Sequence, residues 1–148
     1  MNIFAKQNMN IYIGSDHAGF ELKNKVIKTH PEFIDLGTKN LDSVDFPDYA
    51  NLVCEKMKAD PGSIGILICG SGQGMAMRAN KFSHIRAALV YNDEITQLSR
   101  EHNNANVICM GSRFFSLENA IKLINIIINN LFSEGRHRQR VDKISQST

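Results

Sequence analysis

Residues 63–81, SIGILICGSGQGMAMRANK, place a strand pattern, a glycine-rich loop and a helix pattern in direct succession. The run Ser63–Cys69 is almost entirely apolar, which is typical of a strand covered on both faces of a parallel sheet. Three glycines follow it, and a helix pattern covers Gly74–Lys81. A buried strand that leads through a turn into a helix indicates an α/β fold.

The chain on either side of this stretch repeats the same alternation. Further strand patterns cover Asn10–Gly14, Glu32–Leu36, Arg86–Val90 and Asn106–Met110. Further helix patterns cover Phe20–Thr29, Tyr49–Lys58, Asp93–Glu101 and Leu117–Leu131. Asp93 and Ser116 are candidate N-caps. This alternation predicts a single-domain, three-layer α/β/α sandwich of the Rossmann-like type, with a parallel sheet of about five strands.

Size and composition are those of an ordinary globular domain. The chain has 148 residues, of which 43% are hydrophobic and 22% charged, and its net charge of +2 is too small to predict a nucleic-acid partner. Polar residues interrupt the apolar stretch Leu117–Phe132, so no membrane span is expected. We expect residues 1–8 to form a loose N-terminal extension. The three cysteines lack metal-ligand or CxxC spacing, which favours a reducing, cytoplasmic location.

The glycine loop is the first candidate for a functional site, because ligands of open parallel sheets bind beyond the carboxyl ends of the strands. Glycines at 70, 72 and 74 allow backbone N–H groups to approach a ligand closely. Their spacing matches neither the dinucleotide-binding GxGxxG pattern nor the Walker pattern. Cys69, at the strand end beside these amides, is placed to act as a base or nucleophile. Cys54 and Cys109 are expected to be packing residues.

Five motifs in this order resemble ribose-5-phosphate isomerase type B, and together they cover nearly the whole chain after Met9. They are GSDHAGF at 14–20, GILICGSGQGMAMRANK at 65–81, LSREHNNANV at 98–107, MGSR at 110–113 and EGRHRQRV at 134–141. The resemblance implies an aldose–ketose isomerase that interconverts ribose 5-phosphate and ribulose 5-phosphate through an enediol in the pentose phosphate pathway.

The resemblance assigns the catalytic roles residue by residue. Cys69 corresponds to the family's proton acceptor, and His102 corresponds to the acid that opens the sugar ring. Some members use a glutamate after the third glycine as the base. Here that position is Met75, which cannot accept a proton, so the chain resembles the cysteine-based branch.

The resemblance also assigns the substrate contacts. The corresponding residues are Asp16, His17, Gly70, Ser71, Gly72, Gln73, Gly74, Asn103, Arg113, Arg136 and Arg140. The loop amides of 70–74 would hold the developing oxyanion, and the three arginines would bind the phosphate. Arg136 and Arg140 lie four residues apart, on one face of a helical turn, and His137 between them is also placed to approach a phosphate.

The resemblance further implies an enzyme without a metal or other cofactor. It implies a homodimer or a tetramer, in which residues 133–148 bring Arg136 and Arg140 to a neighbouring subunit's site. Neither a nucleic acid nor a membrane is an expected partner.

Three alternatives remain open from the sequence. Isomerases of six-carbon sugar phosphates, including galactose-6-phosphate isomerase subunits, share the chemistry and differ in the room they leave for the sugar. A non-catalytic phosphate-binding module would keep the glycine loop and the arginines but would not need Cys69. A metal-dependent isomerase would need a cluster of histidines and carboxylates, which the sequence does not show at ligand spacing.

Overall fold

A computed structural model describes residues 9–147 and contains the predicted parallel sheet. The strands are β1 (Ile11–Ser15), β2 (Ile34–Asp35), β3 (Ile64–Cys69), β4 (Ala87–Leu89) and β5 (Val107–Gly111). They are arranged in the order β2-β1-β3-β5-β4, and every neighbouring pair is parallel. The carboxyl ends of all five strands therefore meet at one edge of the sheet, which we call the carboxyl edge. The opposite edge is the amino edge.

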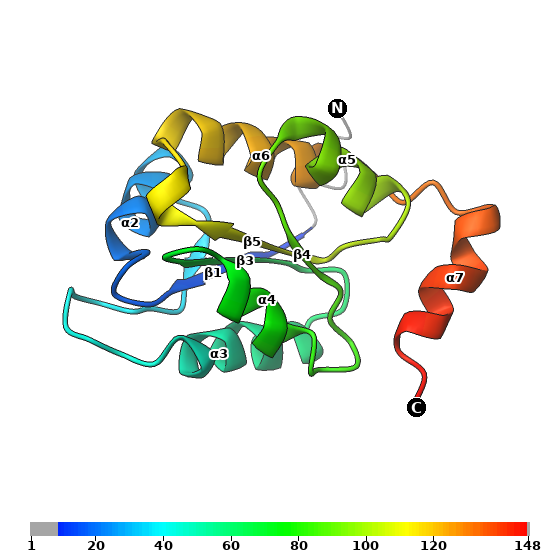
Figure 1. Ribbon diagram of the computed structural model, residues 1–148, viewed down its shortest axis with the longest axis horizontal. Coiled ribbons are helices and arrows are strands. Elements are labelled where there is room, and N and C mark those ends of the chain that lie inside the picture. Colours follow the sequence, from blue (N-terminus) through cyan, green and yellow to red (C-terminus); the bar gives the residue numbers. More distant parts are fainter. Residues whose placement is uncertain (1–8, 148) are drawn as a thin grey trace.

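Helices cover both faces of the sheet, as Figure 1 shows, so the predicted three-layer single-domain fold is confirmed. On one face lie α2 (Phe20–Thr29), α5 (Asp93–Glu101) and α6 (Leu117–Asn129). On the other face lie α3 (Phe46–Lys58) and α4 (Gln73–Ala79). A short 3-10 helix, η1 (Ser112–Phe114), follows β5.

Side-chain alternation along β3 explains where the core lies. Ile64, Ile66 and Ile68 point to the cluster beneath α2 and α6, and all three are at most 1% exposed. Leu67 and Cys69 point to the second cluster, against α3 and α4. Burial of each large aliphatic side chain contributes about 1.5–3 kcal/mol. The same alternation aims Cys69 toward the α3 and α4 side at the carboxyl edge.

Several element boundaries differ from the sequence-based expectations. The predicted strand Glu32–Leu36 shortens to β2, and the predicted helix Tyr49–Lys58 starts earlier, at Phe46, with a proline in its first turn. The N-cap of α5 is Asn92 instead of Asp93, because the Asn92 side chain accepts a hydrogen bond from the Ile95 amide at 2.8 Å. Ser116 caps α6 as predicted. The expectation for residues 1–8 lies outside the described residues.

The last helix, α7 (Arg136–Ile144), stands apart from the layers and projects beyond the amino edge (Figure 1). The chain turns into it through Glu134 and Gly135, which have φ values of 58° and 57°. Before this turn, the Ser133 amide donates a hydrogen bond to the carbonyl of Glu101 at 2.8 Å. Val141, 5% exposed, is its buried residue. Most of α7 is therefore exposed among the described residues.

Residues 9–147 lack two further features. No helix in this range is both long and apolar enough to span a bilayer. Nor do three or more His, Cys, Asp or Glu side chains in this range gather where they could bind a metal ion.

Candidate active site

The loop after β3 holds Cys69 at the carboxyl edge. The Gly72 amide donates a hydrogen bond to Cys69 Sγ at 3.1 Å, so the loop folds back over the sulfur and stabilises negative charge on it. Gly72 has a φ of 82°, which L residues rarely adopt, and a Cβ there would lie 2.9 Å from the backbone of Met110. The Gln73 amide donates to Ser71 Oγ at 3.3 Å. Glycine is therefore required at position 72 for this loop conformation.

Asp16 and His17 lie beside this loop because β1 is the neighbour of β3. The Asp16 amide donates to the carbonyl of Ile68 at 3.2 Å, and Asp16 Oδ1 accepts from the Gly19 amide at 3.1 Å. The Asp16 side chain thus holds the turn just before α2. His17 Nδ1 accepts the Val44 amide at 3.2 Å, so in the neutral ring the proton is on Nε2, which is free to donate.

Arg113 lies on the other side of the loop. Its amide donates to the carbonyl of Gly70 at 3.2 Å. A Cβ on Gly70 would lie 3.3 Å from the Arg113 guanidinium, so the side chain rests against the loop. Asp16, His17, residues 69–74 and Arg113 therefore lie together, and we call them the carboxyl-edge group.

The three cysteines differ in their surroundings. Burial raises the pKa of Cys54 to about 12 and raises the pKa of Cys109 well above its usual range. Both are 0% exposed and serve the packing role expected from the sequence, whereas Cys69 is 6% exposed and faces the loop amides. Only Cys69, among these three, combines solvent contact with a nearby hydrogen-bond donor.

This difference predicts selective alkylation. Iodoacetamide should modify Cys69 alone in the folded protein at pH 8, because the other two thiols are buried and stay protonated at that pH. Mass spectrometry of peptides from the alkylated protein measures the modified positions. In a Cys69→Ser variant the folded protein should remain almost unmodified. Labelling of Cys54 or Cys109 at a similar rate would contradict the packing described above.

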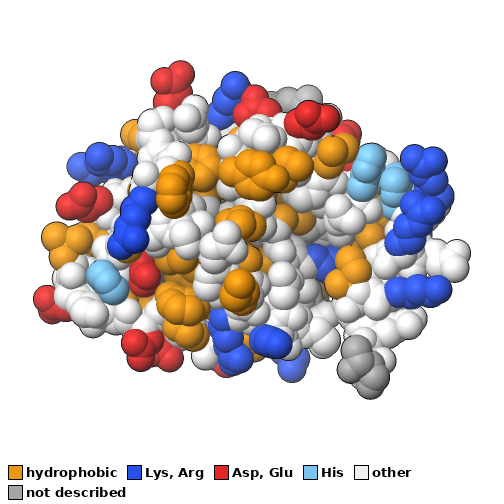
Figure 2. Space-filling view, in the orientation of Figure 1, with side chains coloured by type: hydrophobic (Ala, Val, Ile, Leu, Met, Phe, Trp, Pro, Cys, Tyr) orange, Lys and Arg blue, Asp and Glu red, His pale blue; other side chains and the backbone are white. Residues whose placement is uncertain are grey.

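The remaining predicted residues lie at the amino edge. His102 is the C-cap of α5, and its ring stacks on the ring of His137 from α7, with centroids 4.2 Å apart and planes 13° apart. Burial lowers the pKa of His137, and the nearby His102, Arg136 and Arg140 lower that pKa further. Figure 2 shows histidines beside the Lys and Arg side chains of α7. We call His102, Asn103, Arg136 and Arg140 the amino-edge group.

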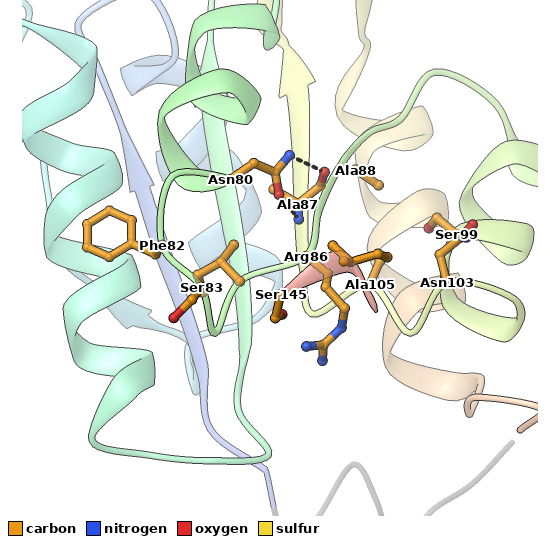
Figure 3. Close-up of a pocket in the computed structure, with 12 residues that line it drawn as sticks. Asn80, Phe82, Ser83, Arg86, Ala87, Ala88, Ser99, Asn103, Ala105 and Ser145 are labelled. Carbon is orange, nitrogen blue, oxygen red and sulfur yellow. Dashed lines mark hydrogen bonds between the residues drawn. The ribbon is translucent and has the colours of Figure 1, made fainter. Parts of the chain in front are cut away.

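A cavity of about 360 Å³ opens beside this group, between the start of β4, the end of α5 and the end of α7. Ser99 and Asn103 line one wall, and Arg86 reaches into the cavity from the loop before β4 (Figure 3). Arg86 Nε donates to the carbonyl of Asn104 at 2.6 Å, and burial lowers the Arg86 pKa. None of residues 69–74 lines this cavity. It therefore belongs to the amino edge and not to the surroundings of Cys69.

Within one chain, the two groups do not meet: His102 and Asn103 lie with the α7 side chains and not with Cys69. Cys69 pairs with Gly111 at the end of β5, whereas His102 lies before β5 begins at Val107. A five-residue strand spans about 13 Å from its first to its last residue, at a rise of about 3.3 Å per residue. His102 and Asn103 therefore lie at the opposite edge from Cys69.

Sequence reasoning missed two contributors to the carboxyl edge. The Val44 amide orients His17, but a backbone donor leaves no residue-type signal. A Cβ on Gly74 would lie only 2.5 Å from the Phe46 ring, so Phe46 packs closely against the start of α4. Its place near the loop follows only from the packing of α3 against α4.

Comparisons with known proteins agree with the motifs. The family model described as Ribose/Galactose Isomerase matches residues 11–144. A relative from Mycoplasma pneumoniae, named probable ribose-5-phosphate isomerase B, is 48% identical over 94% of this chain and 95% of its own length.

Solved structures give the same picture. Ribose-5-phosphate isomerase B from Clostridium thermocellum superposes with a TM-score of 0.89 at 40% identity, covering 93% of this chain and 95% of that one. The enzyme from Mycoplasma genitalium, solved with bound ribulose-5-phosphate, gives a TM-score of 0.87 at 42% identity with the same coverage of both chains. The resemblance inferred from five short motifs thus extends over the whole fold, and the chain belongs to the ribose/galactose isomerase family.

Proposed function

We propose that this protein interconverts ribose 5-phosphate and ribulose 5-phosphate. The observation that carries the proposal is the hydrogen bond from the Gly72 amide to Cys69 Sγ at the carboxyl edge, within a loop of further amides. Its relatives named ribose-5-phosphate isomerase B, one of them with bound ribulose-5-phosphate, support the choice of substrate.

Cys69 is the base in the proposed reaction. Its thiolate removes the proton from C2 of open-chain ribose 5-phosphate, and the C–H electron pair becomes the C1–C2 double bond of an enediolate with its charge on O1. The thiol then returns the proton to C1, while the hydroxyl proton of O2 passes to O1 and O2 becomes the ketone. One base near both carbons is enough, and no oxidant or reductant is consumed.

The loop amides stabilise the enediolate. Because the Gly72 amide is bonded to Cys69 and the Gln73 amide to Ser71, the amides of 70, 71 and 74 are the candidate donors to the sugar oxygens. Each preorganised donor to a developing oxyanion contributes about 10²–10³ in rate. His17, with Nε2 free to donate, and the Asp16 carboxylate supply further contacts to the hydroxyls.

The amino-edge group completes the site from a second copy of the chain in this proposal. His102 opens the furanose ring by protonating its ring oxygen, Asn103 binds sugar hydroxyls, and Arg136 and Arg140 bind the phosphate together with Arg113 of the first copy. The separation of the two groups in one chain supports this arrangement, because neither group alone contains a base, a ring-opening acid and a full phosphate site. The functional unit is then at least a homodimer.

Substrate choice is the first test. We expect kcat/KM for ribose 5-phosphate to exceed that for allose 6-phosphate and galactose 6-phosphate by at least about tenfold, since an added carbon must fit the same phosphate-to-base distance. A coupled assay of ketose formation measures all three under one condition. Preference for a six-carbon substrate would instead place the chain with the galactose-type isomerases. Tight sugar-phosphate binding without any turnover would indicate a non-catalytic binding module.

A further inference from the structure

The two stacked imidazoles at the amino edge carry a further inference, which rests on the proposed function. We propose that His137 is a positioning residue for the reaction: its ring stacks on His102 and fixes the plane in which that imidazole meets the sugar ring. His137 thereby acts in ring opening and not in proton transfer between the sugar carbons.

The backbone around both rings is held in place. The His102 amide donates to the carbonyl of Leu98 at 2.9 Å, which closes α5, and the His137 amide donates to the carbonyl of Glu134 at 3.1 Å, which opens α7. The Ser133 amide bonds the carbonyl of Glu101, the neighbour of His102. The imidazole of His102 has no hydrogen bond among the described residues, so the His137 ring is the contact that restricts its rotation.

The chemistry of the pair fits a positioning role. A centroid distance of 4.2 Å with planes 13° apart leaves the edges of the His102 ring, where both nitrogens lie, free to meet a substrate. The lowered pKa of His137 keeps its ring neutral near pH 7, so the stack holds without repulsion between two cations. Arg136 and Arg140 flank His137 on the same helix, which links the phosphate contacts to the ring-opening acid.

The competing role for His137 is direct contact with the phosphate. The two roles differ in which substrates they affect. Ribose 5-phosphate reaches the enzyme as a furanose and needs ring opening. Ribulose 5-phosphate stays open-chain, because the phosphate blocks the hydroxyl that would close its ring. A phosphate contact serves both sugars equally, whereas positioning of the ring-opening acid serves only the furanose.

Two readouts on the full-length protein separate these roles. One is kcat/KM for ribose 5-phosphate. The other is the exchange of a C1 proton of ribulose 5-phosphate with solvent deuterium, followed by NMR, which requires Cys69 but not ring opening. In His137→Ala we expect kcat/KM for ribose 5-phosphate to fall at least about tenfold, since small displacements of a catalytic group cost up to about 10² in rate. The C1 exchange rate should stay within about twofold of wild type.

Two further variants serve as controls. His137→Phe keeps a flat ring on His102 and should restore kcat/KM to within about threefold of wild type, since only the stack is needed. His30→Ala removes a different stacked imidazole, which lies 4.6 Å from the Phe33 ring at the end of α2, and should leave both readouts unchanged.

Three outcomes would overturn the inference: wild-type kcat/KM in His137→Ala, equal loss of both readouts in that variant, or a His137→Phe variant as impaired as His137→Ala. If the wild-type protein shows neither activity, the proposed function fails first. The stack itself is then tested separately, because loss of the His137 ring current should shift the His102 ring protons in the NMR spectrum of His137→Ala.

Discussion

Replacement of Cys69 by alanine is expected to lower kcat for ribose 5-phosphate at least about 10³-fold, or about 4 kcal/mol in activation free energy, because the base is removed. The loop itself offers no substitute base, since the residue after the third glycine is Met75. Binding should persist, because the arginines and the loop amides remain. Isothermal titration with ribulose 5-phosphate and a coupled turnover assay measure the two quantities on the same sample.

A second cysteine provides the matched control. Cys54→Ala also removes a buried thiol next to α4, but it lies away from the glycine loop, so turnover per folded molecule should stay close to that of wild type. Its cost should appear in thermal unfolding, as a loss of about 1 kcal/mol in stability from the small cavity. Wild-type turnover by Cys69→Ala would contradict the proposed mechanism. Loss of binding together with turnover would assign Cys69 a structural role.

Local signals made most of the fold predictable. The patterns for α2 and α5 match the observed helices residue for residue. The predicted end of α6 was wrong by two residues, because Leu131 fits the helical period although the chain leaves the helix at Asn130. There the Asn130 side chain donates to the carbonyl of Ile126 at 2.8 Å and ends the helix. Periodicity cannot register such a side-chain cap.

The sequence supplied the candidate site residues but not their division between the two edges. Cys69 ends a strand and Asp16 and Arg113 each follow one, so a parallel sheet brings them to one edge. His102 instead precedes a strand, at the end of a helix that runs back to the amino edge. The order of helix and strand around His102 indicated its place at the amino edge, but its role was assigned from the motif without regard to that order. The Val44 amide and the stacked His137 ring depend on tertiary packing and could not be read from residue types.

Mixing two inactive variants should restore activity if the site is shared between copies. Cys69→Ala removes the base from the carboxyl-edge group, and His102→Ala removes the acid from the amino-edge group of the same chain. In a mixed dimer, one site combines both mutated groups and the other combines both intact groups. Random pairing of equal amounts makes half of the dimers mixed, so about a quarter of all sites should regain wild-type activity.

The stoichiometry of this recovery decides between shared and self-contained sites. If each chain formed its own site, every site in the mixture would lack one group, and activity would stay at the level of the two variants alone. Refolding the variants together from denaturant ensures exchange of subunits, and turnover is then compared with that of each variant refolded alone. As a control, Cys69→Ala mixed with Gly72→Val should not recover, because both changes fall in the carboxyl-edge group. Recovery of activity in that control would mean that the two edges do not act as separate halves of the site. Recovery only in the mixture of Cys69→Ala with His102→Ala would require that His102 of one copy reaches Cys69 of another.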